Sequence, residues 1–239
     1  MISRPLMGTA RGISIQPNGI TGLILWLKSD TQTWQDSAFT TAAAANNDPV
    51  GGWRDQSGGG YDATGSGTAR PLLKTSVING YPSIFYDGVN DVLTGAFFTL
   101  KPASMFVVGR IPDAVSIDVL IGNAGNGLGF DIVNTDLRLL RTNVSAIGTA
   151  VGAMTANAWF LAEATYSGAG AYEVLLNSVS KASGTNNLTI SSVAYDIASA
   201  PGGYWARGDI VEVVMYDNVI SASNRQGLET YFNQRYGIW

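Results

Sequence analysis

The sequence contains neither cysteine nor histidine in its 239 residues. Without cysteine there is no disulfide, no thiolate nucleophile and no thiolate metal ligand, which suits a reducing compartment. Without histidine, Ser-His-Asp and Cys-His catalysis, imidazole-bound zinc and the commonest general base near neutral pH are excluded. The metal chemistry that remains is that of oxygen ligands, which calcium prefers.

Charged residues are also scarce, at 13% of the chain with a net charge of −4. The lysines and arginines form no run, so the chain lacks the electrostatic footprint of a protein that binds nucleic acid or an anionic membrane. No stretch approaches the roughly 18 apolar residues of a membrane span, and residues 1–19 lack the apolar core of a secretory signal. We therefore expect no nucleic-acid and no membrane partner, and a chain that begins at Met1 and is made in the cytoplasm.

The residues that are abundant point to β structure. Apolar residues make up 46% of the chain and there are 29 glycines, which is typical of short strands joined by tight turns. Strand-like segments recur from residue 22 onward, separated by turns rich in Gly, Asn, Asp and Ser. The segments are 22–30, 82–87, 91–95, 104–111, 118–123, 127–133, 137–142, 159–167, 171–178, 188–198 and 209–217. This pattern predicts a single all-β domain, an antiparallel two-sheet sandwich or jelly roll.

The two ends of the chain differ from this pattern. Residues 1–20 have neither helical nor strand periodicity and predict an extended arm, so the domain proper is 21–239. Near the other end, apolar residues at helical spacing follow Ser221, a favourable N-cap, and precede Gly237, a favourable C′ residue. These signals predict one C-terminal helix.

The acidic residues give no obvious catalytic pair. The chain has four glutamates, Glu163, Glu173, Glu212 and Glu229. Glu229 lies in the expected helix, and the other three lie on different strands. Asp209 and Glu212 fall on opposite faces if their strand is regular. A glycosidase pair, which stands roughly 5 to 9.5 Å apart, would therefore need acids from separate strands.

Residues 53–64, WRDQSGGGYDAT, combine two aromatics, two aspartates and three consecutive glycines. The segment and the following GSGT lack the features of a phosphate loop, and the acids do not have EF-hand spacing. Three interpretations remain: a turn that shapes the fold, a looser calcium site using Asp55 and Asp62, or a sugar-binding surface.

Several separated segments together resemble one known family. These are LILWLKSD (23–30), WRDQSGGGYDAT (53–64), ARPLL (69–73), NGYPSIFYDGVNDVL (79–93) and the stretch from GDIVEVVMYD to NQRYG (208–237). In this order they resemble concanavalin A-like, laminin-G-like jelly-roll domains of phage virion proteins and bacterial surface proteins. The resemblance implies two curved antiparallel sheets and a W-x-D-x-S-G-x-G motif in which Trp53 anchors the loop, with Asp55 and Ser57 bonding its amides.

Domains of this family commonly bind glycans or proteins and are usually not catalytic. The resemblance and the expected arm favour a non-enzymatic virion structural protein: a phage capsid decoration, head fibre or tail-associated protein located in the virion. Its partners would be other virion proteins, reached through the arm, and further copies of the chain. We expect no catalytic residue and no cofactor, apart from the calcium alternative.

Two other functions stay open. The first is a carbohydrate-binding adhesion module for cell-surface polysaccharide, and the second is a glucanase-like glycoside hydrolase that uses Glu163, Glu173 or Glu212. Aromatic rings that stack on sugars and acids that bond to sugar hydroxyls would form the glycan site. The candidates are Trp53, Asp55, Tyr61, Asp62, Tyr81, Tyr204 and Trp205.

Overall fold

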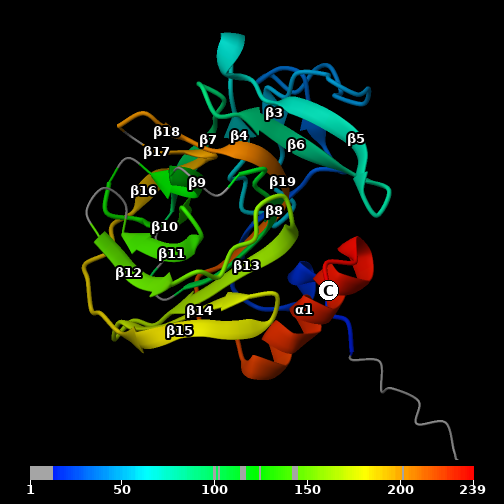
Figure 1. Ribbon diagram of the computed structural model, residues 1–239. Coiled ribbons are helices and arrows are strands. Elements are labelled where there is room, and N and C mark those ends of the chain that lie inside the picture. Colours follow the sequence, from blue (N-terminus) through cyan, green and yellow to red (C-terminus); the bar gives the residue numbers. More distant parts are fainter. Residues whose placement is uncertain are drawn as a thin grey trace, which may run out of the picture.

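The structure is a computed structural model that describes residues 13–98, 101, 103–113, 117–123, 125–141, 145–200 and 202–239. These residues form two large antiparallel sheets and one α-helix near the C-terminal end (Figure 1). The all-β jelly-roll sandwich with a C-terminal helix, predicted from the sequence, is confirmed.

The first sheet carries the helix on its outer face. Its strands are β1 (Leu23–Lys28), β5 (Leu72–Ile78), β6 (Tyr81–Asp87), β8 (Ala103–Arg110), β13 (Trp159–Tyr166), β14 (Ala171–Leu176), β15 (Val179–Thr185) and β19 (Arg207–Tyr216). In space their order is β15-β14-β13-β8-β19-β6-β5, and β1 also pairs with β19. The long strand β19 therefore holds the middle of the sheet together.

The second sheet covers the inner face of the first. Its strands are β2 (Thr33–Trp34), β3 (Gly52–Trp53), β4 (Ala63–Thr64), β7 (Leu93–Phe98), β9 (Ile117–Asn123), β10 (Leu128–Val133), β11 (Asp136–Arg141), β12 (Ser145–Ala150) and β16 (Val193–Ile197). Their order is β12-β11-β10-β9-β16-β7-β4-β3-β2. A small separate hairpin pairs β17 (Ser199–Ala200) with β18 (Tyr204–Trp205), and two short 3₁₀ helices are η1 (Pro17–Gly19) and η2 (Gly67–Ala69).

Strand β13 shows why the first sheet is apolar on both faces. Phe160, Ala162 and Ala164 belong to the core between the two sheets, whereas Leu161 belongs to a second cluster under the helix. Because side chains alternate along a strand, a strand covered on both faces is apolar throughout. A glutamate on such a strand, Glu163, is therefore forced into a buried position beneath the helix.

Helix α1 (Ala222–Tyr236) begins and ends where the sequence predicts. The Ser221 side chain accepts a hydrogen bond from Asn224 N, and Gly237 adopts the left-handed conformation (φ 63°) while its N–H bonds to Asn233 O. Leu228 and Phe232 are fully buried against the first sheet. The helix therefore forms a third layer of the molecule.

The predicted arm, residues 1–20, falls largely on residues 1–12, which lie outside the described residues. From residue 13 the chain runs to the domain: Ile15 N bonds to Gly227 O of α1, and the Tyr216 hydroxyl donates to Pro17 O. Ile20 is buried in the cluster beneath the helix. The described end of this segment thus packs on the domain.

One expectation about strand β19 is corrected. The pairing of β19 with β8 shifts register between Ile210 and Glu212, which marks a β-bulge. A bulge interrupts the alternation of side chains, and Asp209 and Glu212 both point to the helix side, where Asp209 bonds to Ser83 and Glu212 bonds to helix residues. The prediction that they lie on opposite faces assumed a regular strand and is wrong.

Candidate functional site

The loop 53–64 is held by its own side chains. Trp53 is fully buried in the core between the sheets. The Asp55 carboxylate accepts hydrogen bonds from Trp26 N (2.9 Å), Ser57 N (2.8 Å) and Tyr61 N (3.1 Å), and from the Ser57 hydroxyl. These contacts match the shaping role that the family resemblance implies for Trp53, Asp55 and Ser57.

The same contacts bear on the sugar and calcium interpretations of this loop. A fully buried Trp53 ring has no face for a sugar, and Asp62 Oδ1 already accepts Asp55 N at 2.8 Å. Tyr61 is half-buried against the core. Among the residues that the structure describes, no three acidic side chains gather as metal ligands. We therefore place the candidate site elsewhere.

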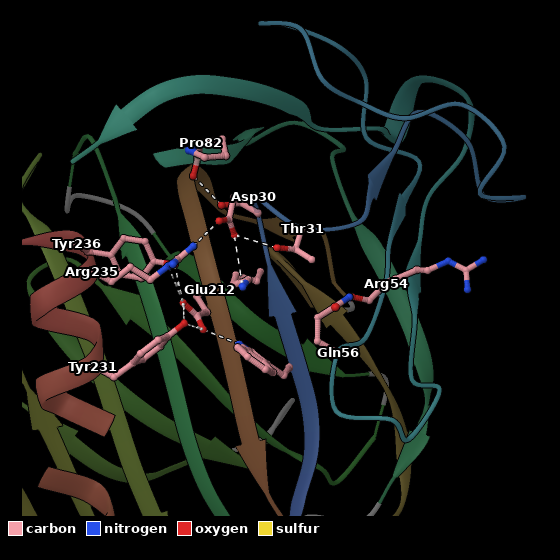
Figure 2. A network of polar contacts seen from close by, with 12 residues as sticks. Asp30, Thr31, Arg54, Gln56, Pro82, Glu212, Tyr231, Arg235 and Tyr236 are labelled. Carbon is pink, nitrogen blue, oxygen red and sulfur yellow. Dashed lines mark hydrogen bonds and ion pairs between the residues drawn. The ribbon is translucent and has the colours of Figure 1, made fainter. Parts of the chain in front are cut away.

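A second polar cluster surrounds Glu212 beneath the helix. Figure 2 shows its carboxylate between Tyr231 and Tyr236. It accepts hydrogen bonds from Trp26 Nε1 (2.5 Å), Tyr231 OH (3.1 Å) and Tyr236 OH (2.5 Å), and Arg235 Nε lies 4.0 Å away. Burial raises the pKa of Glu212, while these hydrogen bonds lower it. Donors of the protein itself supply the hydrogen bonds that this buried carboxylate needs, so Glu212 is a structural acid.

Tyr81 belongs to the edge of that cluster. The Arg235 guanidinium lies 4.0 Å from the centre of the Tyr81 ring, and the ring packs edge-to-face on Tyr236. Arg235 also pairs with Asp30. Tyr81 is thus engaged in contacts within the domain. The two other aromatic candidates lie on the β17–β18 hairpin, where Tyr204 is 45% exposed and Trp205 is half-buried.

The β14–β15 hairpin lies beside helix α1 (Figure 1). Where its turn meets the helix there is a surface pocket, which we call the helix pocket. The turn residues Asn177 and Ser178 have positive φ angles of 50° and 65°, as a two-residue hairpin turn requires. The pocket has a volume of about 700 Å³, within the usual range for small-molecule sites. It is lined by Ser178, Gln226, Glu229, Thr230, Asn233, Gln234 and Trp239.

The chemistry of the helix pocket is that of hydroxyl and amide groups beside an indole. Trp239 is 48% exposed, and its backbone N–H is tied to Asn233 Oδ1 at 2.9 Å. The Ser178 hydroxyl is buried and forms no hydrogen bond with any described residue. Buried polar atoms are normally paired, so this hydroxyl is an unsatisfied group in the pocket wall.

Two glutamates meet beside this pocket. Glu229 lines it from the helix, and Glu163 of β13 lies against Glu229. Ser178 N donates to Glu163 Oε1 at 2.9 Å, so the pocket wall also touches the second acid. Burial raises the pKa of Glu163 well above its usual range, and the charge of Glu229 raises it further. Sequence reasoning missed this pair because it considered the helix acid and the strand acid separately.

The described part of the chain contains no helix that is both long and apolar enough to cross a membrane. No protein-family model matches the sequence, and the search of curated proteins finds no relative.

Solved structures, by contrast, share the architecture. Trypanosoma rangeli sialidase matches with a TM-score of 0.62 at 14% identity, over 94% of this chain and 36% of the sialidase. The ligand-binding domain of botulinum neurotoxin serotype D, solved with N-acetylneuraminic acid, matches with a TM-score of 0.58 at 13% identity. The match covers 89% of this chain and 51% of the toxin chain.

Domain 4 of AbnA, an extracellular GH43 arabinanase from Geobacillus stearothermophilus, was solved with arabinotriose. It matches with a TM-score of 0.59 at 15% identity, over 87% of this chain and 98% of that domain. The chain spans about a third of the length of the sialidase and about half of the toxin domain. At these identities the likeness establishes the fold alone: the chain is a β-sandwich like the matched parts of these structures.

Proposed function

We propose that the chain is a carbohydrate-binding module that holds a glycan in the helix pocket without hydrolysing it. The observation that carries the proposal is the lining of that pocket, where hydroxyl and amide side chains surround the half-exposed Trp239. Sugar rings stack on aromatic faces, and their hydroxyls exchange hydrogen bonds with side chains of these types. The β-sandwich neighbours solved with N-acetylneuraminic acid and arabinotriose support the same class of ligand.

The arrangement of acids supports a binding role over hydrolysis. The Glu163 and Glu229 carboxyl groups lie close enough to raise the pKa of Glu163, whereas the acids of glycosidases stand roughly 5 to 9.5 Å apart to admit the sugar and water. Glu212 is fully buried behind the helix, and Glu173 is paired with Arg225. These contacts support the proposal of a module that binds a glycan without hydrolysing it.

The binding proposal is tested on a glycan array, followed by calorimetry on the glycans that bind. Trp239→Ala should weaken binding at least about tenfold, because it removes the stacking face while keeping the other pocket side chains. Tyr204→Ala is the matched control, since Tyr204 is similarly exposed but lies on the β17–β18 hairpin. Loss of binding in the Tyr204 variant alone would move the site to the hairpin.

We propose further that this module works as an adhesion protein of a virion, attached through residues 1–12 and present in several copies. The support is the family resemblance and the course of the chain: Ile13 is 82% exposed, while Ile15 is already bonded to α1. The described chain therefore begins beside the helix.

Two deletions separate attachment from folding. Removing residues 1–12 should leave thermal stability unchanged and abolish incorporation into particles seen by electron microscopy. Removing residues 1–19 should also lower stability, because Pro17 accepts a hydrogen bond from buried Tyr216. Normal incorporation of the shorter deletion would refute attachment through this segment.

A further inference from the structure

A cluster with an excess of negative charge adjoins the helix pocket at Glu229. Three carboxyl groups and one guanidinium gather there: Glu163 on β13, Glu173 on β14, and Arg225 and Glu229 on α1. Arg225 Nη1 donates to Glu173 Oε2 at 2.9 Å, and Arg225 Nε is 3.5 Å from Glu229 Oε1. One cation therefore serves three acids, and its stronger contact is with Glu173.

Two carboxyl oxygens in this cluster accept no hydrogen bond, although Arg225 lies at ion-pair distance from one of them. No N–H or hydroxyl group of the described residues forms a hydrogen bond to Glu163 Oε2 or Glu229 Oε1, although both atoms are buried. Two adjacent carboxylates in a buried place do not both ionise readily. A proton held between the two groups supplies the missing hydrogen bond when the pocket is empty, and the raised pKa of Glu163 agrees with this.

A bound cation could replace that proton. Glu229 lines the pocket, so a positive group on a ligand held there would lie beside its carboxyl group. No lysine or arginine of the described residues lines the pocket, so a ligand carrying a carboxylate would meet Glu229 without a compensating charge. This distinguishes the pocket from a site suited to N-acetylneuraminic acid, the acidic sugar found with the toxin domain.

We propose that the helix pocket is selective for amino sugars with a free ammonium group, which pairs with Glu229 and displaces the proton shared with Glu163 into the solvent. The sugar ring stacks on Trp239, and its hydroxyls bond to the side-chain amides that α1 places in the pocket. The inference rests on the carbohydrate-binding function proposed above and adds the class of sugar.

The test compares two trisaccharides with the same skeleton, one of β-1,4-linked glucosamine and one of β-1,4-linked N-acetylglucosamine. Calorimetry at pH 6 should show the free-amine trisaccharide binding at least about tenfold more tightly than the acetylated one. Repeating the titration in buffers of different ionisation enthalpy should show proton release on binding. This readout needs only the unaltered protein.

Two variants assign the effect to the pocket. Glu229→Gln keeps the size of the side chain and should abolish both the preference and the proton release. Asp113→Asn is the control for general attraction to an acidic protein, because it removes one negative charge from a residue about half exposed and outside the pocket. It should keep the full preference for the free amine.

The outcomes separate the two proposals. Equal affinity for the two trisaccharides, or a preference that survives in Glu229→Gln, overturns the amino-sugar inference alone. Binding of other neutral glycans that Trp239→Ala abolishes, with neither trisaccharide bound, also overturns it while the binding function stands. If no glycan of any class binds, both proposals fall.

Discussion

Glu212 and Glu163 lie on the same face of the first sheet, under the same helix, and both are buried. Glu212 accepts hydrogen bonds from the Trp26 indole of β1 and from the Tyr231 and Tyr236 hydroxyls of α1 (Figure 2). Glu163 accepts one from the Ser178 amide, and its other oxygen faces no donor among the described residues. The same helix thus brings neutral donors to Glu212 but a second carboxyl group, Glu229, to Glu163.

The difference indicates which acid serves the fold and which is open to a ligand. A fully satisfied buried network fixes a single arrangement of helix and sheet. A buried acid without its full set of donors lowers stability unless something else completes it. Glu163, which lacks its full set of donors, adjoins the helix pocket. This makes the pocket a stronger candidate site than the cluster around Glu212.

The largest effect should come from breaking the complete network. Glu212→Ala leaves the Trp26 indole and the Tyr231 and Tyr236 hydroxyls without their acceptor. Each unpaired buried donor costs about 1 to 3 kcal/mol, so we expect a loss of about 5 kcal/mol in the free energy of unfolding, measured by denaturant titration. Glu212→Gln keeps one acceptor oxygen and should lose less than half as much; equal stability of all three proteins would contradict the structural role.

Trp53→Ala should have the next largest effect. Its ring is fully buried between the sheets, and removing such a ring costs about 3 to 5 kcal/mol. Denaturant unfolding measures this directly. A loss below about 1 kcal/mol would mean that the ring is exposed in solution and would reopen the loop 53–64 as a binding surface.

The smallest effect on the free energy of unfolding should come from Glu163→Gln, and it should be a gain in stability where the other two variants lose it. Because the folded pKa of Glu163 is raised, the unfolded chain releases this proton at lower pH than the folded chain does. Below the pKa that Glu163 has in the unfolded chain, both states carry the proton and the folded protein has its full stability. As pH rises from this unfolded pKa toward the folded pKa, the unfolded chain loses the proton first and the folded protein loses stability. The variant should therefore gain at least about 1 kcal/mol over the unaltered protein at pH 8 and little at pH 4.

This prediction is checked by unfolding both proteins at several pH values. A variant that is less stable at pH 8 would show that Glu163 is already satisfied in the folded state. Glu163 would then have its full set of hydrogen bonds, as Glu212 has, and the two acids would no longer differ in this respect.

Much of the fold could be predicted because its signals are local. Ser221 and Gly237 bound the helix through their own capping contacts, and apolar strands between Gly-rich turns indicate the sandwich. Strand β15 was missed because VSKASGT has no apolar alternation and is exposed along most of its length. Strands β5 and β12 were also missed, and the predicted strand 188–198 is reduced to β16.

The site depended on contacts that no local pattern encodes. Glu163 and Glu229 are far apart in the sequence and meet only because α1 packs across β13. The bulge in β19 likewise follows from its pairing with β8. Of the aromatic candidates, Trp53 and Tyr81 are engaged within the domain, whereas Trp239, which was not considered, lines the pocket. An exposed tryptophan close to helix amides was the signal that could have indicated it.

The most direct test of the account is an NMR titration that follows the indole N–H signals of the six tryptophans as a glycan that binds is added. The account predicts that the Trp239 signal shifts with saturation, while the buried Trp26 and Trp53 signals stay in place. Saturable shifts at Trp205 with none at Trp239 would contradict it, because the ligand would then occupy the β17–β18 hairpin instead of the helix pocket.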